Sequence, residues 1–210
     1  MTRPSARHVL PGLTGGTSLG PRTRDPYAKL MEEQIVMPGT PLDDTAANDV
    51  TAQFMHLEHK GPDGISLYVN SPGGPFGPMT AVHDTMPHVA RDVETVRPGR
   101  AGTSAAVPPA AGTPGKRYAL PGARTVLRQP ALPEPPEGRA GDPVIRAEEQ
   151  PRARSRPEEM LARHTGRSRE RVSADIGHER VLTAQEALEH RLVDRITPGR
   201  AAVPAPPAGE

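Results

Sequence analysis

NSPGG at residues 70–74 and GRAGTSAA at residues 99–106 are the two stretches that decide the fold of this chain. Each follows a short apolar run, residues 65–69 and residues 93–96, of the kind found in buried strands. Glycines at the end of a strand indicate a tight turn, and the backbone N–H groups of a Pro-Gly-Gly turn can converge on one ligand atom. On spacing alone, both stretches also fit ordinary loops. Together they predict an oxyanion-binding turn, followed by a turn that presents two hydroxyl groups ahead of a helix.

Outward from these turns, short apolar runs alternate with segments of helical periodicity. Further strands are expected at residues 35–37 and 125–127, and Asp43 or Asp44 is placed to cap a helix over residues 45–59. The remaining helices are expected at residues 27–34, 158–165, 167–176 and 184–190, the last capped by Thr183. The repeated order of strand, helix and strand predicts an α/β fold with parallel strands and right-handed crossovers.

Prolines conflict with two of the helices that this order requires. Pro78 falls inside the segment after the first turn, and Pro108 and Pro109 fall inside the segment after the second. A proline inside a helix costs about 3 kcal/mol, because it removes a hydrogen bond and clashes with the preceding turn. Pro78 and Pro109 are the hardest to accommodate, whereas Pro75 fits a first turn, and we expect the helix after the second turn to be distorted.

The composition suits one soluble domain with a thin core. The 210 residues carry a net charge of +1, which gives no field to attract nucleic acid or an anionic membrane. The chain has no cysteine, and its eight histidines lack metal-ligand spacing, so no cofactor or metal is expected. No run approaches the ~20 apolar residues of a membrane span, and no signal-like segment is found, so a cytoplasmic location is expected. With 27 prolines and 2% aromatic residues, marginal stability is expected unless subunit contacts add burial.

Five motifs occur in a fixed order along the chain. They are DPYAKL at residues 25–30, YVNSPGG at 68–74, AAGTPGKRYALP at 110–121, LARHTG at 161–166 and LTA at 182–184. In order and spacing they resemble the proteolytic subunit of the Clp protease, a family of S14-type peptidases, over roughly residues 26–197. The resemblance implies a crotonase-like spiral of ββα units and the activity of an ATP-dependent serine endopeptidase.

The resemblance also divides the chain into parts. Residues 1–25 are a basic arm, expected to be flexible, where the family has an axial loop, and residues 26–197 are the Clp-like domain. Residues 128–157 stand where the family has a handle that interleaves two heptameric rings, but their prolines predict a degraded, irregular element. Residues 198–210 are a Pro/Ala tail for which no structure is expected.

A serine protease needs a hydroxyl nucleophile, an imidazole base and a carboxylate that orients the imidazole. Counted from the motifs, the nucleophile position falls on Thr103, with Ser104 directly after it, the base position on Arg128 and the carboxylate position on Glu179. A guanidinium has no lone pair to offer and a pKa above about 12, so Arg128 cannot take a proton. We expect Arg128 and Glu179 to form an ion pair instead.

Other parts of the family's site are implied by the same alignment of motifs. The oxyanion donors would be the backbone N–H groups of Gly74 and Ser104. His164, in the LARHTG turn, is expected to be structural, and His178 could replace the missing base only if its loop rotated inward.

Partners also follow from the resemblance: homo- or hetero-oligomeric rings with Clp proteolytic subunits, and docking of a Clp ATPase. Of the aromatic docking positions, Tyr68 is retained, while Ser66 and His88 occupy two others, which predicts weakened docking. Three functions stay open: a catalytically silent ring subunit or modulator, a serine endopeptidase that uses Ser104 or Thr103, and a decayed paralogue that folds poorly.

Overall fold

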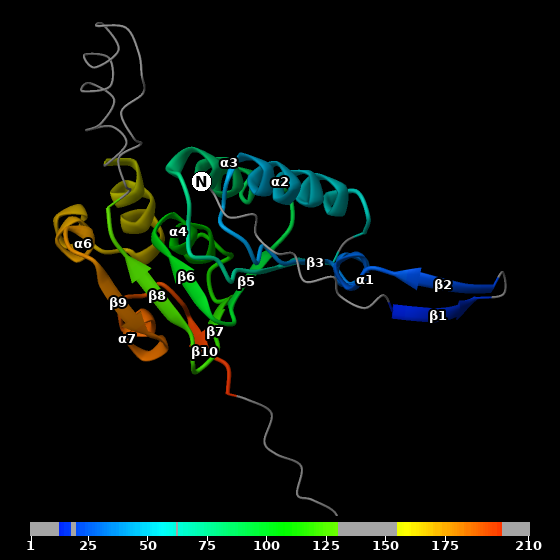
Figure 1. The fold of residues 1–210 in the computed structure, drawn as a ribbon. Coiled ribbons are helices and arrows are strands. Elements are labelled where there is room, and N and C mark those ends of the chain that lie inside the picture. The colour runs from blue at the N-terminus through cyan, green and yellow to red at the C-terminus, as the bar shows by residue number, and fades with distance from the viewer. Residues whose placement is uncertain (1–12, 18–19, 62, 130–154, 199–210) are drawn as a thin grey trace, which may run out of the picture.

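The computed structural model of the chain describes residues 13–17, 20–61, 63–129 and 155–198, and gives the backbone alone for residues 13–17, 20–24 and Thr103 (Figure 1). The strands are β1 Leu13–Thr17, β2 Gly20–Arg24, β3 Ile35–Val36, β4 Ile65–Tyr68, β5 Val93–Arg97, β6 Arg100–Gly102, β7 Arg117–Ala119, β8 Arg124–Leu127, β9 Arg180–Thr183 and β10 Arg195–Ile196. The helices are α1 Pro26–Glu32, α2 Asp44–Glu58, α3 Phe76–Thr85, the 3-10 turn η1 Thr103–Ala106, α4 Val107–Ala110, α6 Arg169–Ile176 and α7 Ala184–Glu189. A further helix covers residues 155–165.

Two sheets lie at the centre of the fold. The larger has the strand order β10-β7-β5-β4-β3, and each neighbouring pair is parallel. The smaller has the order β6-β8-β9, in which β6 runs parallel and β9 antiparallel to β8. Figure 1 shows α2 and α3 along one side of the sheets, with α6 and α7 beside β8 and β9.

The chain builds these sheets by repeating one unit. β5 enters the larger sheet, β6 enters the smaller, and η1 with α4 follows; β7, β8 and the helix over residues 155–165 repeat this order. An abbreviated unit precedes them, in which β4 is followed by a single parallel bridge between Ser71 and Ala101 and then by α3. The predicted α/β spiral of ββα units is therefore confirmed in the described residues, and β9 adds an antiparallel strand that was not expected.

The prolines lie where a helix tolerates them. Pro78 is the third residue of α3, and Pro108 and Pro109 are the second and third residues of α4. The first N–H groups of a helix have no partner within the helix, so a proline there sacrifices no hydrogen bond. Pro78, which was hard to accommodate on the sequence alone, is tolerated in α3 for this reason. The segment that begins at Thr103 is distorted as expected, because it starts as the 3-10 turn η1 and continues as a single turn of α-helix.

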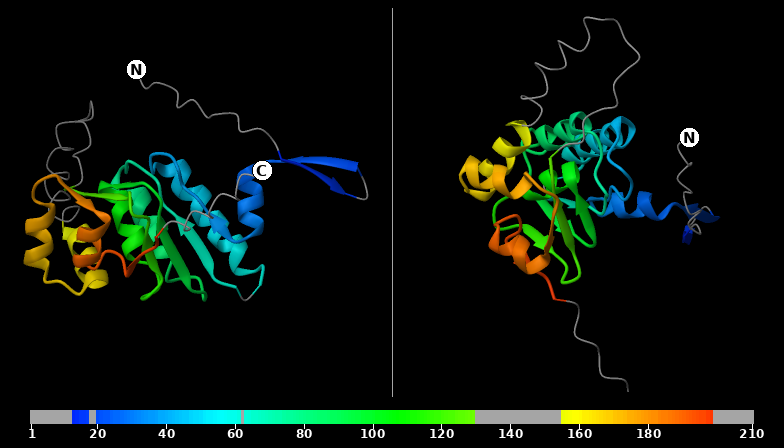
Figure 2. Two further views of the ribbon diagram at one scale, coloured as in Figure 1. Left: turned by 90° about the horizontal axis from the view of Figure 1, so that it is seen from below. Right: turned by 60° about the vertical axis from the view of Figure 1, so that its left-hand side comes forward.

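Part of the expected N-terminal arm has regular structure. β1 and β2 form an antiparallel hairpin in which Leu13 faces Arg24, and Figure 2 shows it projecting past α1, away from the sheets. The periodicity of this segment did not predict strands. The predicted handle residues 130–154, the tail from residue 199 and the first twelve residues lie outside the described part of the chain.

The core contains one charged side chain with no exposed surface. Arg97, at the end of β5, donates to the Thr125 hydroxyl at 3.1 Å and to the Leu192 carbonyl at 3.0 Å. These bonds connect the larger sheet to the smaller sheet and to the segment after α7. No carboxylate among the described residues pairs with Arg97, and burial, together with the nearby Arg117, lowers the pKa of its guanidinium to about 9.

Candidate functional site

The two glycine turns lie side by side. Ser71 N–H donates to the Arg100 carbonyl at 2.8 Å, and Gly102 N–H donates to the Ser71 carbonyl at 3.0 Å. The side chain of Asn70 accepts a further bond from Arg100 N–H at 3.0 Å. Because β4 and β5 are parallel neighbours, the segments that follow them leave the sheet at the same edge, which brings the turns together. This is the juxtaposition that an oxyanion-binding turn beside a nucleophile turn requires.

Close backbone approach explains two of the glycines. A Cβ atom on Gly74 would lie 2.2 Å from the Leu42 carbonyl oxygen, and one on Gly102 would lie 2.3 Å from the Pro72 carbonyl oxygen. No side chain fits at such distances. Gly73 has φ of 103°, a backbone conformation that favours glycine. The turn over residues 70–74 is therefore held rigidly against its neighbours.

Ser104 connects the two turns through its side chain. Its hydroxyl accepts the Gly74 N–H at 2.9 Å and donates to the Gly74 carbonyl at 2.8 Å. Ser104 is 4% exposed, so these bonds are shielded from water. One of the two predicted oxyanion donors, the N–H of Gly74, is thus already engaged by a side chain of the same protein. No local sequence pattern predicts this bond, because it joins residues thirty positions apart.

Thr103, at the predicted nucleophile position, begins η1 directly after Gly102. Its backbone is described and its side chain is not. The strand β6, the turn and the helical segment after it therefore have the order expected of a hydroxyl-presenting turn.

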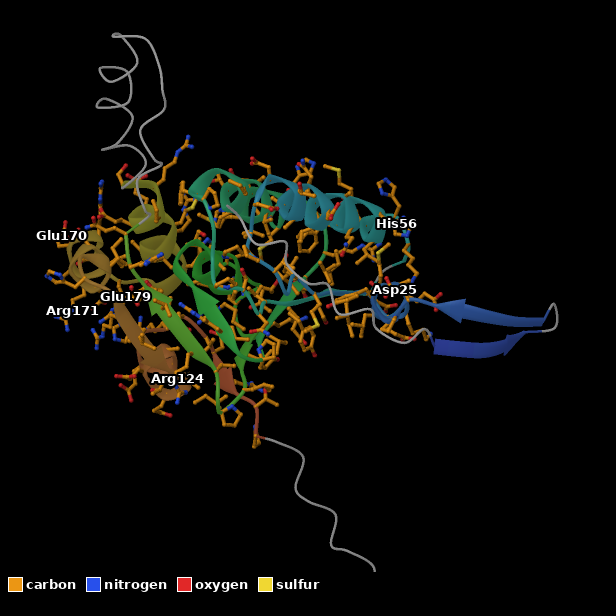
Figure 3. The ribbon with its side chains drawn as sticks, in the orientation of Figure 1. Asp25, His56, Arg124, Glu170, Arg171 and Glu179 are labelled. Atoms are coloured by element: carbon orange, nitrogen blue, oxygen red, sulfur yellow. The ribbon has the colours of Figure 1, made fainter. Side chains whose placement is uncertain are left out.

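Arg128 and Glu179 face each other across β8 and β9. The antiparallel register pairs Leu127 with Arg180, so the next pair along the strands is Arg128 and Glu179. Arg128 Nη1 lies 3.4 Å from Glu179 Oε2, and the two side chains are 48% and 55% exposed. Figure 3 shows Glu179 toward the α6 end of these strands. The ion pair expected from the sequence is present, with the long distance and high exposure of a surface pair worth roughly 0–1 kcal/mol.

A small pocket lies between Ser104 and Arg128. The rest of its lining is apolar and comes from α3, α4, β8, the helix over residues 155–165 and α6: Phe76, Val107, Leu127, Pro157, Leu161 and Ile176. Sequence reasoning did not single out these side chains. Their helical and strand periodicity marks them as buried, and periodicity does not distinguish a core position from a pocket wall.

The sequence profile of the Clp protease family matches residues 18–200 of the chain. The chain belongs to the Clp protease family. It is 62% identical, over 98% of both chains, to a protein of Streptomyces coelicolor named as ATP-dependent Clp protease proteolytic subunit-like. It is 48% identical to ATP-dependent Clp protease proteolytic subunit 2 of the same organism, over 91% of this chain and 88% of the relative. It is 47% identical to proteolytic subunit 1 of Corynebacterium diphtheriae, over 93% and 94% respectively.

In this chain, the side chain of His164 contacts another histidine. Its Nε2 lies 2.8 Å from Nε2 of His83, and His83 Nδ1 lies 2.7 Å from the Asp84 carboxylate. Burial above all, and then the nearby His83, Arg163 and Arg117, lower the pKa of His164 to about 4. His178 is exposed at the end of α6. The partner of His164 was missed because His83 lies 81 residues away in the sequence.

A second group of charged side chains lies on the other side of Leu127 and Leu161, beside another small pocket. Asp175 accepts from Arg167 at 2.7 Å and from Arg180 at 3.0 Å, and Arg167 also contacts His190. Burial, and then Arg167, lower the pKa of His190. This group holds the ends of α6 and α7 together.

Among the described residues, no group of three or more histidine, aspartate or glutamate side chains is arranged to hold a metal ion. None of the helices found there combines the length and the apolar character needed to cross a membrane. Of the predicted docking positions, Ser66 and Tyr68 are half-buried on one face of β4, and His88 is exposed after α3.

Proposed function

We propose that this chain is a catalytically silent subunit, or a modulator, of rings formed with Clp proteolytic subunits. The observation that carries the proposal is the contact between Arg128 Nη1 and Glu179 Oε2 at 3.4 Å. An ion pair occupies the two positions at which the family resemblance implies an imidazole base and its carboxylate. An exposed guanidinium offers no lone pair near neutral pH, so Arg128 cannot take the proton of the Thr103 hydroxyl.

The contacts of Ser104 argue against the alternative that it acts as a serine nucleophile. Its proton is directed to the Gly74 carbonyl at 2.8 Å, which is no base, and no histidine among the described residues accepts from it. A site without a base retains about 10³-fold catalysis over water when its oxyanion hole is intact. Here the Gly74 N–H of that hole is engaged by Ser104, so still less is expected.

The comparisons support a role in a ring. The chain covers at least 88% of each of the three relatives described above, and two of these are named as proteolytic subunits. Streptomyces coelicolor has both a subunit-like relative and a proteolytic subunit, which is the situation in which a silent copy can join active ones. Weakened docking of a Clp ATPase, through Ser66 and His88, and a cytoplasmic location stay predictions of the same proposal.

The buried core argues against a decayed chain that does not fold. Side chains from both sheets and from α2, α3, α6 and α7 are buried in one cluster, among them Phe54, Leu67, Met79, Ile176 and Ala187. Pro78 lies in the first turn of α3, and Pro108 and Pro109 follow directly on the 3-10 turn η1 in a short helical segment that ends at Ala110. The local sequence preferences and the tertiary packing therefore favour the same structure, as they do in chains that fold.

The proposal is tested by labelling the purified protein with a fluorophosphonate probe, which reacts only with an activated hydroxyl. We expect no labelling of the wild-type chain under conditions that label an active Clp proteolytic subunit. Labelling that is abolished by Thr103→Ala or Ser104→Ala would contradict the proposal and establish a serine-type endopeptidase.

Restoring the missing groups provides a gain-of-function control. The combination of Thr103→Ser, Arg128→His and Glu179→Asp should make the chain react with the probe, because it supplies a hydroxyl, a base and a carboxylate at the implied positions. The matched control keeps Arg128 and instead replaces Arg124, the first residue of β8, by histidine; it should remain unlabelled. Co-purification with an active proteolytic subunit tests the ring role separately.

A further inference from the structure

The side chains of Arg167, Asp175 and His190 meet at the ends of α6 and α7. Arg167 Nη1 lies 2.7 Å from Asp175 Oδ2 and also contacts His190 Nδ1. His190 Nδ1 in turn lies 3.3 Å from the same carboxylate oxygen, and only 10% of the Asp175 side chain and 12% of the His190 side chain are exposed. One largely buried oxygen therefore lies within reach of both the guanidinium and the imidazole.

The contact with Arg167 determines the protonation state of His190. A guanidinium nitrogen only donates, so the Nδ1 atom that it contacts offers a lone pair, and the ring is neutral with its proton on Nε2. A second proton would place an N–H on Nδ1, opposite the N–H of Arg167. Two donors cannot bond to each other, whereas Asp175 Oδ2 can accept the new N–H.

Four charged groups act on the His190 ring. Two are positive, Arg167 before α6 and Arg180 at the start of β9, and two are negative, Asp175 on α6 and Glu186 on α7 itself. The other side chains around the small pocket beside His190 are uncharged: Leu127, Leu161, Thr165, Val172 and Leu192. Burial above all, and then Arg167, lower the pKa of His190 from its ordinary value of 6.5. The ring is therefore neutral at pH 7 and takes up its second proton in acid.

Arg167 is the member of the group that can leave. His190 ends α7, where its N–H donates to the Glu186 carbonyl at 2.8 Å, and Asp175 lies within α6, where its other oxygen accepts from Arg180 at 3.0 Å. Arg167 lies in the turn between the helix over residues 155–165 and α6. Both contacts of its side chain with described residues come from Nη1, so loss of Asp175 and His190 as acceptors removes them together.

We propose that Asp175 exchanges partners when His190 takes up a proton: protonated His190 donates to Asp175 Oδ2, Arg167 is released, and the turn over residues 166–168 loosens. This pH-responsive exchange does not depend on whether the chain is catalytically silent. Leu161, on the helix before the turn, and Ile176, on α6 after it, both line the small pocket between Ser104 and Arg128. The exchange therefore acts on the two elements that form one side of the candidate site.

The test is hydrogen exchange of the full chain, followed by mass spectrometry of peptides that cover residues 164–172. Gly166 N–H donates to the Ala162 carbonyl at 2.9 Å, and Val172 N–H donates to the Ser168 carbonyl at 3.1 Å, so these amides report on both ends of the turn. After correction for the intrinsic effect of pH, exchange relative to α2 should be about 5- to 10-fold faster at pH 5 than at pH 7.5, because the turn loses a charged hydrogen bond. Equal protection at the two pH values would overturn the inference.

Two variants place the exchange on His190 and Arg167. His190→Gln cannot gain a charge, while its amide oxygen can still accept from Arg167, so it should keep the turn protected at both pH values. Arg167→Gln removes the guanidinium and should exchange fast at both. The matched control Arg171→Gln, on the exposed surface of α6 (Figure 3), should behave as the wild type.

The other buried histidine pair provides the competing explanation. His164→Gln should retain the faster exchange in acid, because His164 is not part of the group around Asp175. An acid effect that is lost in His164→Gln and kept in His190→Gln would contradict the inference and assign the effect to the contact between His83 and His164. An acid effect that persists in Arg167→Gln would also contradict it, and circular dichroism at both pH values checks that each variant is folded.

Discussion

Ser104 and Gly74 form two hydrogen bonds with each other, and both involve the same hydroxyl. The hydroxyl accepts the Gly74 N–H at 2.9 Å and donates to the Gly74 carbonyl at 2.8 Å. Gly74 is also packed closely against the Leu42 carbonyl, which leaves no room for a Cβ atom. The residue after the nucleophile position thus contributes to the stability of the turn and at the same time engages a donor that oxyanion stabilisation needs.

This double role predicts opposite effects on rate and stability. In the chain carrying Thr103→Ser, Arg128→His and Glu179→Asp, the additional change Ser104→Ala should increase the rate of fluorophosphonate labelling by up to about 10²-fold, because one oxyanion donor is worth 10²–10³ in rate. It should also lower the free energy of unfolding by about 1–3 kcal/mol, measured by urea denaturation, since a buried partner is lost.

Ser104→Thr is the control for this prediction. It keeps a hydroxyl at the same position and should keep the low labelling rate. A Ser104→Ala variant in which labelling and stability fall together would show that Ser104 is a structural residue only.

At the scale of elements, a pair of histidines connects α3 to the helix over residues 155–165. His83 is 4% exposed, and its Nε2 lies 2.8 Å from Nε2 of His164. When both imidazoles are neutral, the N–H of one ring can donate a hydrogen bond to the other ring nitrogen. When both rings are protonated, two N–H donors would face each other instead. Both connected elements also contribute side chains to the pocket wall, Phe76 from α3 and Leu161 from the other helix.

This pair predicts a loss of stability in mild acid. The pKa of His164 is lowered to about 4 in the fold from an unfolded value near 6.5, so between these two values the unfolded chain binds more protons than the folded one. The stability that depends on neutral His164 is therefore full above about pH 6.5 and is lost as the pH falls toward 4. Partial exposure reduces the loss to roughly 1–2 kcal/mol.

Urea denaturation at pH 7 and pH 4.5 measures this loss. His164→Gln should make the difference between the two pH values smaller, whereas His56→Gln, on the exposed surface of α2 (Figure 3), should leave it unchanged. An equal pH dependence in wild type and His164→Gln would contradict the assignment of the acid-dependent loss of stability to His164.

The elements themselves were largely predictable, and the exceptions have a physical cause. Helical periodicity and N-cap residues predicted both α2 and α7. In α2, Asp43 accepts a hydrogen bond from the Ala46 N–H, and in α7, Thr183 and Glu186 form a capping box. The effect of Pro78 was not predictable, because it depends on the residue at which α3 begins. A shift of that boundary by one turn would turn a tolerated proline into a helix breaker.

At the scale of the whole molecule, the core is built mainly from small and medium side chains. Alanines and valines are numerous in the buried cluster, which includes Phe54 and no other fully buried aromatic side chain among the described residues. Small side chains bury less apolar area each, so a single subunit gains less from folding. Burial between subunits would add to the stability of each one.

The ring role therefore predicts a stability that depends on concentration. Dilution of the full chain from about 10 µM to about 0.1 µM should lower Tm and reduce the assembled fraction seen by native mass spectrometry, because association stabilises the folded subunit by mass action. Mixing with an active proteolytic subunit should raise Tm at the lower concentration. A constant Tm and a monomer at every concentration would contradict the ring role.

The sequence by itself determined the family, the order of helices and strands, the two glycine turns and the arginine at the base position. These are properties of the chain, because periodicity, turn residues and the identity of a residue at a motif position do not depend on distant contacts. Tertiary structure alone decided that Ser104 binds Gly74 thirty residues away, that His83 meets His164 at a separation of 81, and that side chains of several helices enclose a pocket beside Arg128. Such contacts depend on where the sheet brings distant segments of the chain together, and no local sequence pattern predicts which segments will lie next to each other.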